Sequence, residues 1–199
     1  MTTISQDSTT ANETEQNRLR IIGAAIGAFS KRGFPESSME DIVRESGVAP
    51  EVAYDLFPGK YDVLKVLGDL NKMAATGMLD GVTKESPLPP TDEIVARVAD
   101  FFESMAESGA PAGIAPQAMG LALYDEEVNV IIQDVFAALR ASWDALAVRM
   151  AAEGRLPEGT EPEDVGATLL TVALGFMSHS MIGGVNAGSL RRGLHAVLA

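Results

Sequence analysis

The 199-residue chain contains no cysteine and only two histidines, His179 and His195. The absence of cysteine excludes disulfides, thiolate metal sites and cysteine nucleophiles. Two histidines leave almost no material for a histidine-based catalytic triad, and the sequence has no phosphate-binding loop, nucleotide fingerprint or metal-ligand spacing. We therefore expect a protein that is not an enzyme and that uses no metal or other cofactor.

Long apolar runs are also missing. The least polar stretch, residues 169–185, is interrupted by Ser178, His179 and Ser180 and is short for a membrane span, so we expect a buried helix there. Residues 1–12 are rich in Ser, Thr, Asn and Gln and lack both an apolar core and a basic start, which is typical of a disordered tail and not of a signal peptide. These features predict a cytoplasmic protein with no membrane partner.

Basic residues are scarce: 15 Lys and Arg stand against 28 Asp and Glu, for a formal net charge of −13. Residues 18–66 are balanced, with seven residues of each sign, whereas the chain beyond them has 18 acidic and eight basic residues. An acidic region is repelled by nucleic acid and by anionic membranes. Any contact with DNA must therefore be confined to the N-terminal end.

What the sequence does contain is a helix-turn-helix pattern between residues 38 and 60. Met39, Ile42 and Val43 fall on one helical face, and the apolar period resumes in a second run that begins at Pro50. Gly47 stands where the chain must bend sharply between the two helices, because glycine adopts a positive φ at little cost. From these residues alone, the alternative is an ordinary helical hairpin in an all-α bundle.

The sequence on either side of this hinge is more specific. Residues 18–33 form an amphipathic helical pattern that ends at Gly33, a typical C-cap. From about residue 18 to 67 the chain closely resembles the N-terminal domain of the tetracycline-repressor (TetR) family of bacterial transcription regulators. The residues that carry this resemblance, in the family's order and spacing, are I-I-G-A-A-I-G-A-F-S-K-R-G-F, Ser37, Ser38, Ile42, Ser46, Gly47, Val48, Tyr54, Phe57, Lys60 and Leu64.

The resemblance implies a homodimer in which each subunit lays the second hinge helix in a major groove of a pseudo-palindromic, double-stranded operator. It also implies that Ser38, Tyr54 and Lys60 contact phosphates, for which a hydroxyl, a phenol and an ammonium are all suitable donors. Their alternative roles are capping, packing and plain solvation, respectively. The complete set of expected DNA-binding residues is Ser38, Arg44, Ala49, Pro50, Glu51, Tyr54 and Lys60.

The hinge departs from the family pattern in two ways. Val43 stands where a small residue is usual and Ala53 where a large aliphatic is usual, and because these positions should face each other, the two changes roughly conserve core volume. The second hinge helix carries Glu51 and Asp55 and no basic residue, although phosphate attraction normally supplies most non-specific affinity. Glu51 could accept from a cytosine amino group or could merely stabilise its helix N-terminus.

Beyond residue 60 the patterns are helical throughout, so we expect an all-α fold of about nine helices. We predict a disordered tail (1–12), a three-helix helix-turn-helix DNA-binding domain (13–60) and a helical ligand-binding and dimerisation domain (61–199). Residues 163–182 and 187–198 are candidates for the dimer interface, because small residues in the first segment would let a partner helix approach. The alternative is a central core helix.

Methionines and aromatic residues recur in the second domain, and such surfaces adapt to varied ligands. A bundle must also fill its own centre, so each of these residues could instead be core. The candidates for a mostly apolar pocket are those that come from different helices and could converge: Phe102, Met119, Trp143, Met177 and His179.

Together these features predict a ligand-responsive, DNA-binding transcriptional regulator, a repressor that a small apolar ligand releases from a palindromic operator. The alternative is a helical small-molecule-binding or protein-interaction module that has lost specific DNA binding.

Overall fold

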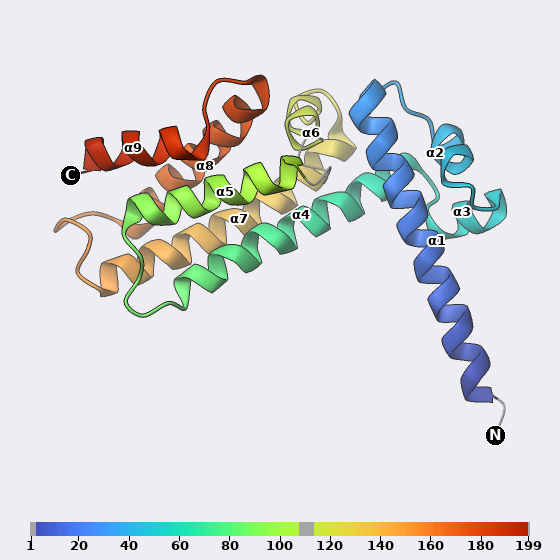
Figure 1. The fold of residues 1–199 in the computed structure, drawn as a ribbon, viewed down its shortest axis with the longest axis horizontal. Helices are drawn as coiled ribbons and strands as arrows, with labels where there is room; N and C mark the ends of the chain where they lie inside the picture. The colour runs from blue at the N-terminus through green and yellow to red at the C-terminus, as the bar shows by residue number, and fades with distance from the viewer. Residues whose placement is uncertain (1–2, 108–113, 199) are drawn as a thin grey trace.

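A computed structural model describes residues 3–107 and 114–198, and within these ranges the chain forms nine α-helices and no strand (Figure 1). The all-α fold predicted from the sequence is confirmed. The helices are α1 (Thr3–Arg32), α2 (Met39–Ser46), α3 (Pro50–Leu56), α4 (Lys60–Thr83), α5 (Thr91–Glu107), α6 (Ala115–Leu121), α7 (Glu126–Ala152), α8 (Pro162–Ile182) and α9 (Ala187–Leu198).

The helices form two groups, which α4 joins (Figure 1). α1, α2 and α3 pack together at one end of the molecule, and α4, α5, α7, α8 and α9 run along the other end as a bundle. α6 lies between the two groups. α4 begins beside the three N-terminal helices and continues through the bundle, so it is the element through which a change in one group can reach the other.

The predicted disordered tail at residues 1–12 differs from the structure, in which α1 already begins at Thr3; residues 1–2 lie outside the described residues. The first 22 residues contain neither glycine nor proline. A helix nucleated further along the chain can therefore propagate toward the N-terminus without a breaker. The anchored part begins near Ile21 and Ile22, which are buried.

The hinge between α2 and α3 has the local structure that the sequence predicts. Ser38 caps α2 by accepting a hydrogen bond from the backbone N–H of Asp41 at 3.1 Å. Gly47 ends the helix with φ +64°, where a side chain would be strained. Ser46 stabilises the turn, because its hydroxyl donates to the carbonyl of Val43 at 2.8 Å and accepts from the N–H of Val48 at 3.1 Å.

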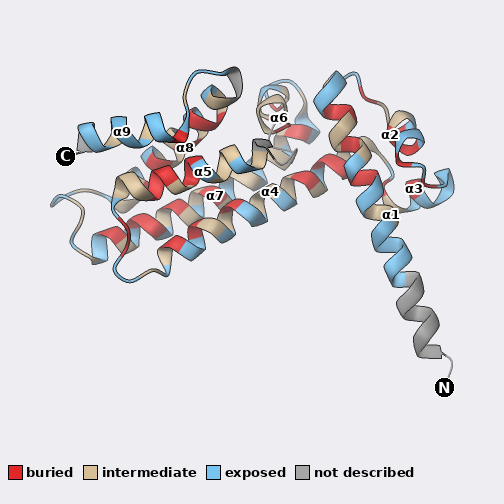
Figure 2. Ribbon diagram, viewed as in Figure 1, coloured by how far each residue is buried: buried red, intermediate tan, exposed pale blue. Residues whose placement is uncertain are grey.

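Two large groups of buried apolar residues hold the fold together (Figure 2). The first joins α1, α2, α3 and the start of α4, and it also includes residues of α6 and α7. Val43 and Ala53 both belong to this first core and are 7% and 0% exposed. The second core fills the bundle around Trp143 and Leu146. Because the first core crosses from one helix group to the other, the two groups share apolar packing.

The apolar stretch at residues 169–185 is buried on one side only. Leu169, Ala173 and Phe176 lie in the interior, whereas one stripe of α8 is exposed. That stripe consists of Thr168, Thr171, Gly175 and His179. No helix within the described ranges combines the length and the apolar composition needed to cross a bilayer.

Candidate DNA interface and apolar cavity

The short helix α3 presents one face to solvent and packs the other into the first core. Ala53 is fully buried, whereas Glu51 and Tyr54 are exposed, as are Ala49 and Pro50 at the start of the helix. Pro50 occupies the first turn, where its missing N–H costs nothing. Four of the seven residues expected to bind DNA thus lie on one accessible face.

Lys60 does not lie free on that face. Its ammonium donates to the carbonyls of Phe34, Pro35 and Ser37 at 3.0, 3.2 and 3.0 Å, and it sits 4.5 Å from the centre of the Phe34 ring. An ammonium has three N–H donors, and these contacts account for all of them. Lys60 therefore holds the turn between α1 and α2 and is more than a solvated lysine; the phosphate contact expected of it would require the ammonium to exchange one of these bonds.

Ser38 and Arg44 both contact Asp41. The Arg44 guanidinium forms an ion pair with the Asp41 carboxylate, and Ser38 caps the same residue's N–H. The hydrogen bond from Arg44, followed by the one involving Ser38, holds the pKa of Asp41 below its usual range. The Arg44 side chain is still 68% exposed. It can therefore reach a phosphate, whereas Ser38 already has its capping role.

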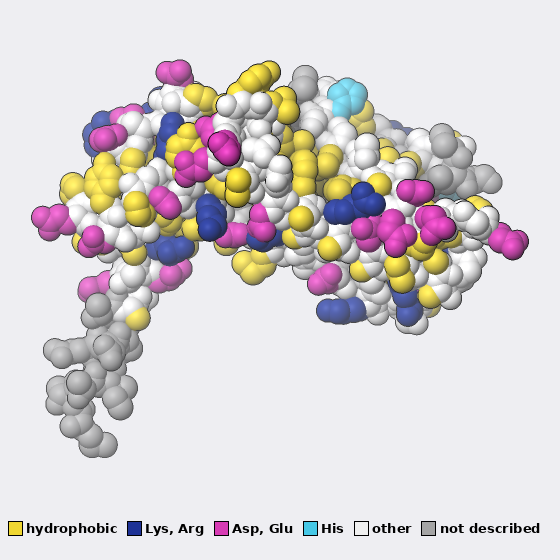
Figure 3. Space-filling model, turned by 180° about the vertical axis from the view of Figure 1, so that it is seen from behind, with side chains coloured by type: hydrophobic (Ala, Val, Ile, Leu, Met, Phe, Trp, Pro, Cys, Tyr) yellow, Lys and Arg dark blue, Asp and Glu magenta, His cyan; other side chains and the backbone are white. Residues whose placement is uncertain are grey.

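Most of the other basic residues near the hinge also have partners within the protein. Arg20 donates to the carbonyl of Gly47 at 3.1 Å, Arg32 pairs with Glu45 at 3.0 Å, and Arg18 stacks over the ring of Phe57. On the face shown in Figure 3, Lys and Arg side chains are interspersed with Asp and Glu and form no continuous basic patch. On this face, little unpaired positive charge is therefore available to attract phosphate.

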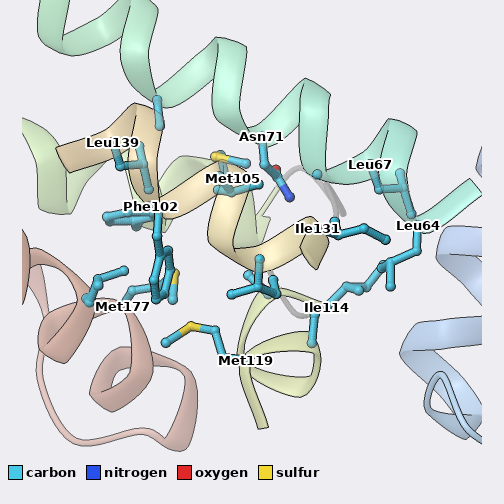
Figure 4. Close-up of a pocket in the computed structure, with 18 of the residues that line it drawn as sticks. Leu64, Leu67, Asn71, Phe102, Met105, Ile114, Met119, Ile131, Leu139 and Met177 are labelled. Atoms are coloured by element: carbon cyan, nitrogen blue, oxygen red, sulfur yellow. The ribbon is translucent and has the colours of Figure 1, made fainter. Parts of the chain in front are cut away.

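An apolar cavity of about 80 Å³ lies among α4, α5, α6, α7 and α8 (Figure 4). No charged side chain is found among the described residues that line it. These are Leu64, Leu67, Gly68, Asn71, Ala75, Phe101, Phe102, Met105, Ile114, Ala115, Ala118, Met119, Ile131, Ile132, Val135, Phe136, Leu139, Leu174 and Met177.

Three of the five residues expected in a pocket line this cavity. Phe102, Met119 and Met177 reach it from α5, α6 and α8. Trp143 does not: it is buried in the second core and borders a neighbouring void of about 20 Å³. His179 is exposed on α8 and packs against Gly184 instead. Its isolated position in an apolar helix does not place it in a pocket, because α8 has a solvent-facing side.

The cavity wall and the first core share residues. Leu64 and Leu67 of α4, with Ile114 and Ala118 at α6, line the cavity and are also buried members of the core that supports α1, α2 and α3. Protein interiors are close-packed and transmit small displacements to their neighbours. A molecule that enlarges the cavity must therefore also displace residues on which the hinge helices rest.

A second connection runs through aromatic rings. Phe34 packs between Phe29 and Tyr61, with ring centroids 5.1 Å apart in both pairs. The Tyr61 hydroxyl then donates to the Asp125 carboxylate at 2.7 Å. Asp125 caps α7. The turn after α1 is thus connected to the N-terminus of a bundle helix.

Residues 21–67 match the family model for the bacterial regulatory proteins of the tetR family. This N-terminal segment is of the tetR family. The matched segment runs from the second half of α1 through the hinge to the first turns of α4. It contains the exposed face of α3, the Lys60 contacts and two of the α4 residues that line the cavity.

Two curated relatives of this chain come from Pseudomonas putida. The uncharacterised HTH-type transcriptional regulator TtgW is 38% identical over 58 residues, which are 29% of this chain and 43% of TtgW. The HTH-type transcriptional regulator SrpR is also 38% identical over 58 residues, covering 29% of this chain and 27% of SrpR. The chain thus matches less than half the length of either relative.

Solved structures resemble the chain over most of its length. Salmonella enterica GusR has a TM-score of 0.74 at 22% identity, with 92% of this chain and 95% of GusR covered. The SmeT–triclosan complex has a TM-score of 0.70 at 19% identity, covering 84% and 81%. FadR from Bacillus subtilis in complex with stearoyl-CoA has a TM-score of 0.68 at 18% identity, covering 91% and 97%. At these identities the likeness concerns the fold.

The α4 wall of the cavity and its polar residue, Asn71, are not among the residues predicted from the sequence. A signal was present, because Leu64, Leu67, Gly68, Asn71 and Ala75 repeat at helical spacing and share one face. On that face a single amide stands among apolar and small residues. Without knowing which helices pack against α4, that face could not be distinguished from an ordinary core stripe.

Proposed function

We propose that this chain is a transcriptional regulator that binds operator DNA as a homodimer and is released by a small, mostly apolar effector. The exposed residues Ala49, Pro50, Glu51 and Tyr54 face the major groove, and Arg44 approaches the phosphate backbone. Lys60 is left out of this set because its donors are used within the protein. Ser38 contributes through the position of the α2 N-terminus.

The observation that carries the proposal is the wall that the cavity shares with the first core. Leu64 and Leu67 lie one and two turns after Lys60, whose ammonium holds the α1–α2 turn. An effector between α4 and α6 therefore acts on the helix that positions α3. A ligand shifts such an equilibrium only if it binds one state better than the other. Here the preferred state is the one with the enlarged cavity.

The consequence for DNA follows from dimer geometry. Two recognition helices must lie about one turn of DNA, or roughly 34 Å, apart to engage both half-sites. A displacement of α4 in each subunit changes this separation, so the effector-bound dimer no longer fits the operator. Release of a DNA-bound dimer by its effector corresponds to repression.

The dimer is proposed to form through α8 and α9. The exposed stripe of α8 includes Thr168, Thr171 and Gly175, whose small size would let a partner helix approach closely. The opposite side of α8 packs on the bundle. A contact there would join the two subunits without covering α3, which lies in the other helix group (Figure 1).

Two structural neighbours support an effector site. The SmeT structure is a complex with triclosan, and the Bacillus subtilis FadR structure is a complex with stearoyl-CoA. Both proteins therefore bind a molecule with a large apolar part. An apolar cavity between helices of a bundle is a common place for such a ligand.

A gel-shift experiment with the DNA that flanks the chain's own gene tests the proposal. We expect specific retardation at physiological salt that excess unlabelled fragment competes and unrelated DNA does not. Ala49→Glu should abolish it, because a carboxylate at the start of α3 repels phosphate, while an acidic N-cap leaves the helix stable. Ala137→Glu, which adds the same charge on an exposed part of α7, is the matched control.

One observation favours a second function, a helical small-molecule-binding module that does not read DNA. The exposed residues of α3 include Glu51 and Asp55 and no Lys or Arg, and most nearby basic residues are paired within the protein. Equal, non-specific retardation by wild type and by Ala49→Glu would favour this alternative.

A further inference from the structure

The cavity described above contains one polar side chain. Among the described residues that line it, Asn71 of α4 alone carries a hydrogen-bonding side chain; the others are aliphatic, aromatic, methionine or glycine. Figure 4 shows its amide directed toward the space between α4 and α7. Within the described part of the chain this amide makes no hydrogen bond, and the residue is half-buried.

A hydrogen-bonding side chain is not needed in this wall by a protein that only has to pack its core. The Asn71 amide is not fully buried and lines the cavity, so a molecule that enters the cavity can reach it. Other α4 positions on the same face, Leu64, Leu67 and Ala75, show that the helix accommodates purely apolar residues there. A hydrogen-bonding partner supplied from outside the protein would satisfy the Asn71 amide.

We propose that Asn71 is the specificity-determining residue for the effector and that the effector is an uncharged, mainly apolar molecule with one hydroxyl or carbonyl group. An amide offers both a donor and an acceptor, so it can pair with either group. The absence of Lys, Arg, His, Asp and Glu from the described cavity wall excludes a charged head group inside it. The remaining contacts are apolar and set the size and shape of the ligand.

The position of Asn71 also determines what its hydrogen bond does. Asn71 lies on the same helical face as Leu64 and Leu67, which belong to the first core. A ligand held by Asn71 is therefore held against α4, the helix that joins the two groups. This inference rests on the proposed function, because it assigns a chemical class to the effector.

Phenol and toluene are suitable probes because they are nearly isosteric and differ by a hydroxyl in place of a methyl. Calorimetric titration of the full chain should show phenol binding about tenfold more tightly than toluene, although water holds phenol more strongly. Benzoate, a charged analogue, should not bind. In Asn71→Leu the order should reverse, with toluene the tighter ligand. Gln133→Leu, which makes the same change from an amide to leucine at an exposed position of α7 outside the described lining, should keep the wild-type preference.

Folding is monitored in the same samples. Asn71→Leu removes an unpaired amide, so its melting temperature should equal or exceed that of wild type, and Asn71→Ala provides a second variant in case leucine does not fit. An unchanged phenol-to-toluene ratio in both variants, tighter binding of benzoate, or no binding of any probe to wild type would overturn the inference.

These outcomes are separable from failure of the proposed function. Specific retardation of DNA with no discrimination between phenol and toluene would show that Asn71 does not determine effector specificity, and the proposed DNA binding would stand. If ligand discrimination depends on Asn71 but no DNA is specifically retarded, the chemical class assigned to the effector would stand and the proposed operator binding would be rejected.

Discussion

The ammonium of Lys60 lies 3.0 Å from the carbonyl oxygen of Phe34 and 4.5 Å from the centre of the same residue's ring. Lys60 is the first residue of α4, where a positive charge opposes the helix dipole. Its contacts with the turn after α1 offset that cost. The helix that lines the cavity is therefore fixed at its first residue to the domain that carries α3.

Replacing Lys60 with methionine should destabilise the protein. The substitution keeps the length of the side chain and removes the hydrogen bonds to Phe34 and Ser37, so we expect a loss of about 2 kcal/mol in the free energy of unfolding. Urea unfolding measures this. Lys65→Met, an exposed position on the same helix, is the control and should change stability little. A Lys60→Met protein of unchanged stability whose DNA binding has lost about one unit of salt slope would restore the phosphate role.

Val43 and Ala53 should be energetically coupled. Both are buried in the first core, so Val43→Ala leaves a cavity and should cost about 2 kcal/mol. Adding Ala53→Leu should recover much of this loss by refilling the same space. The two single variants and the double variant form a thermodynamic cycle measured by thermal melting, and additive effects would show that the two positions do not compensate each other.

Tyr54 should affect DNA binding without affecting stability. Its side chain is exposed, so Tyr54→Phe leaves the core intact and removes only the hydroxyl. Loss of one phosphate contact of about 1 kcal/mol corresponds to roughly fivefold weaker operator binding. Tyr124→Phe, at a residue 89% exposed outside α3, is the matched control. Equal operator affinities of the two variants would show that the Tyr54 hydroxyl makes no contact with DNA.

The contact between Tyr61 and Asp125 predicts a pH dependence of stability. The hydrogen bond from Tyr61, supported by backbone N–H groups of α7, holds the pKa of Asp125 below its usual range. The contact's contribution is therefore present above the unfolded pKa, about 3.9, and is lost as the pH falls through the lowered folded value. The same hydrogen bond raises the pKa of Tyr61, so at the alkaline end the contribution is lost only above about pH 10.

Asp125→Asn keeps a capping oxygen but provides no carboxylate for the Tyr61 hydroxyl. Its free energy of unfolding should fall less than that of wild type between about pH 5 and pH 3, measured by urea unfolding across that range. Asp55→Asn, which makes the same charge change at an exposed residue of α3, should follow the wild-type curve. Parallel curves for Asp125→Asn and wild type would show that Asp125 does not contribute to the loss of stability at acid pH.

Local patterns in the sequence predict the hinge because its determinants are local. Gly47 at a positive φ and Ser38 as a cap act within a few residues of their own positions. The role of Lys60 could not be predicted in this way, because its partners lie 23 to 26 residues earlier in the chain and are backbone carbonyls, which carry no sequence signal.

The candidate pocket could be predicted only in part for a related reason. Phe102, Met119 and Met177 can be identified because they are large, apolar and on separate helices. Trp143 satisfies the same description but points into the second core, and His179 lies on the exposed side of α8. The rotation of each helix about its axis decides between these outcomes, and tertiary packing sets that rotation.

Footprinting of the retarded DNA fragment tests most directly the claim that this chain is a dimeric operator-binding regulator. We expect two protected, symmetry-related half-sites on one face of the DNA, with centres one helical turn, about 34 Å, or a whole multiple of it apart. Ala49→Glu should remove both half-sites together. Absence of any defined protected sequence at protein concentrations that retard the fragment, or protection that Ala49→Glu leaves unchanged, would contradict the claim.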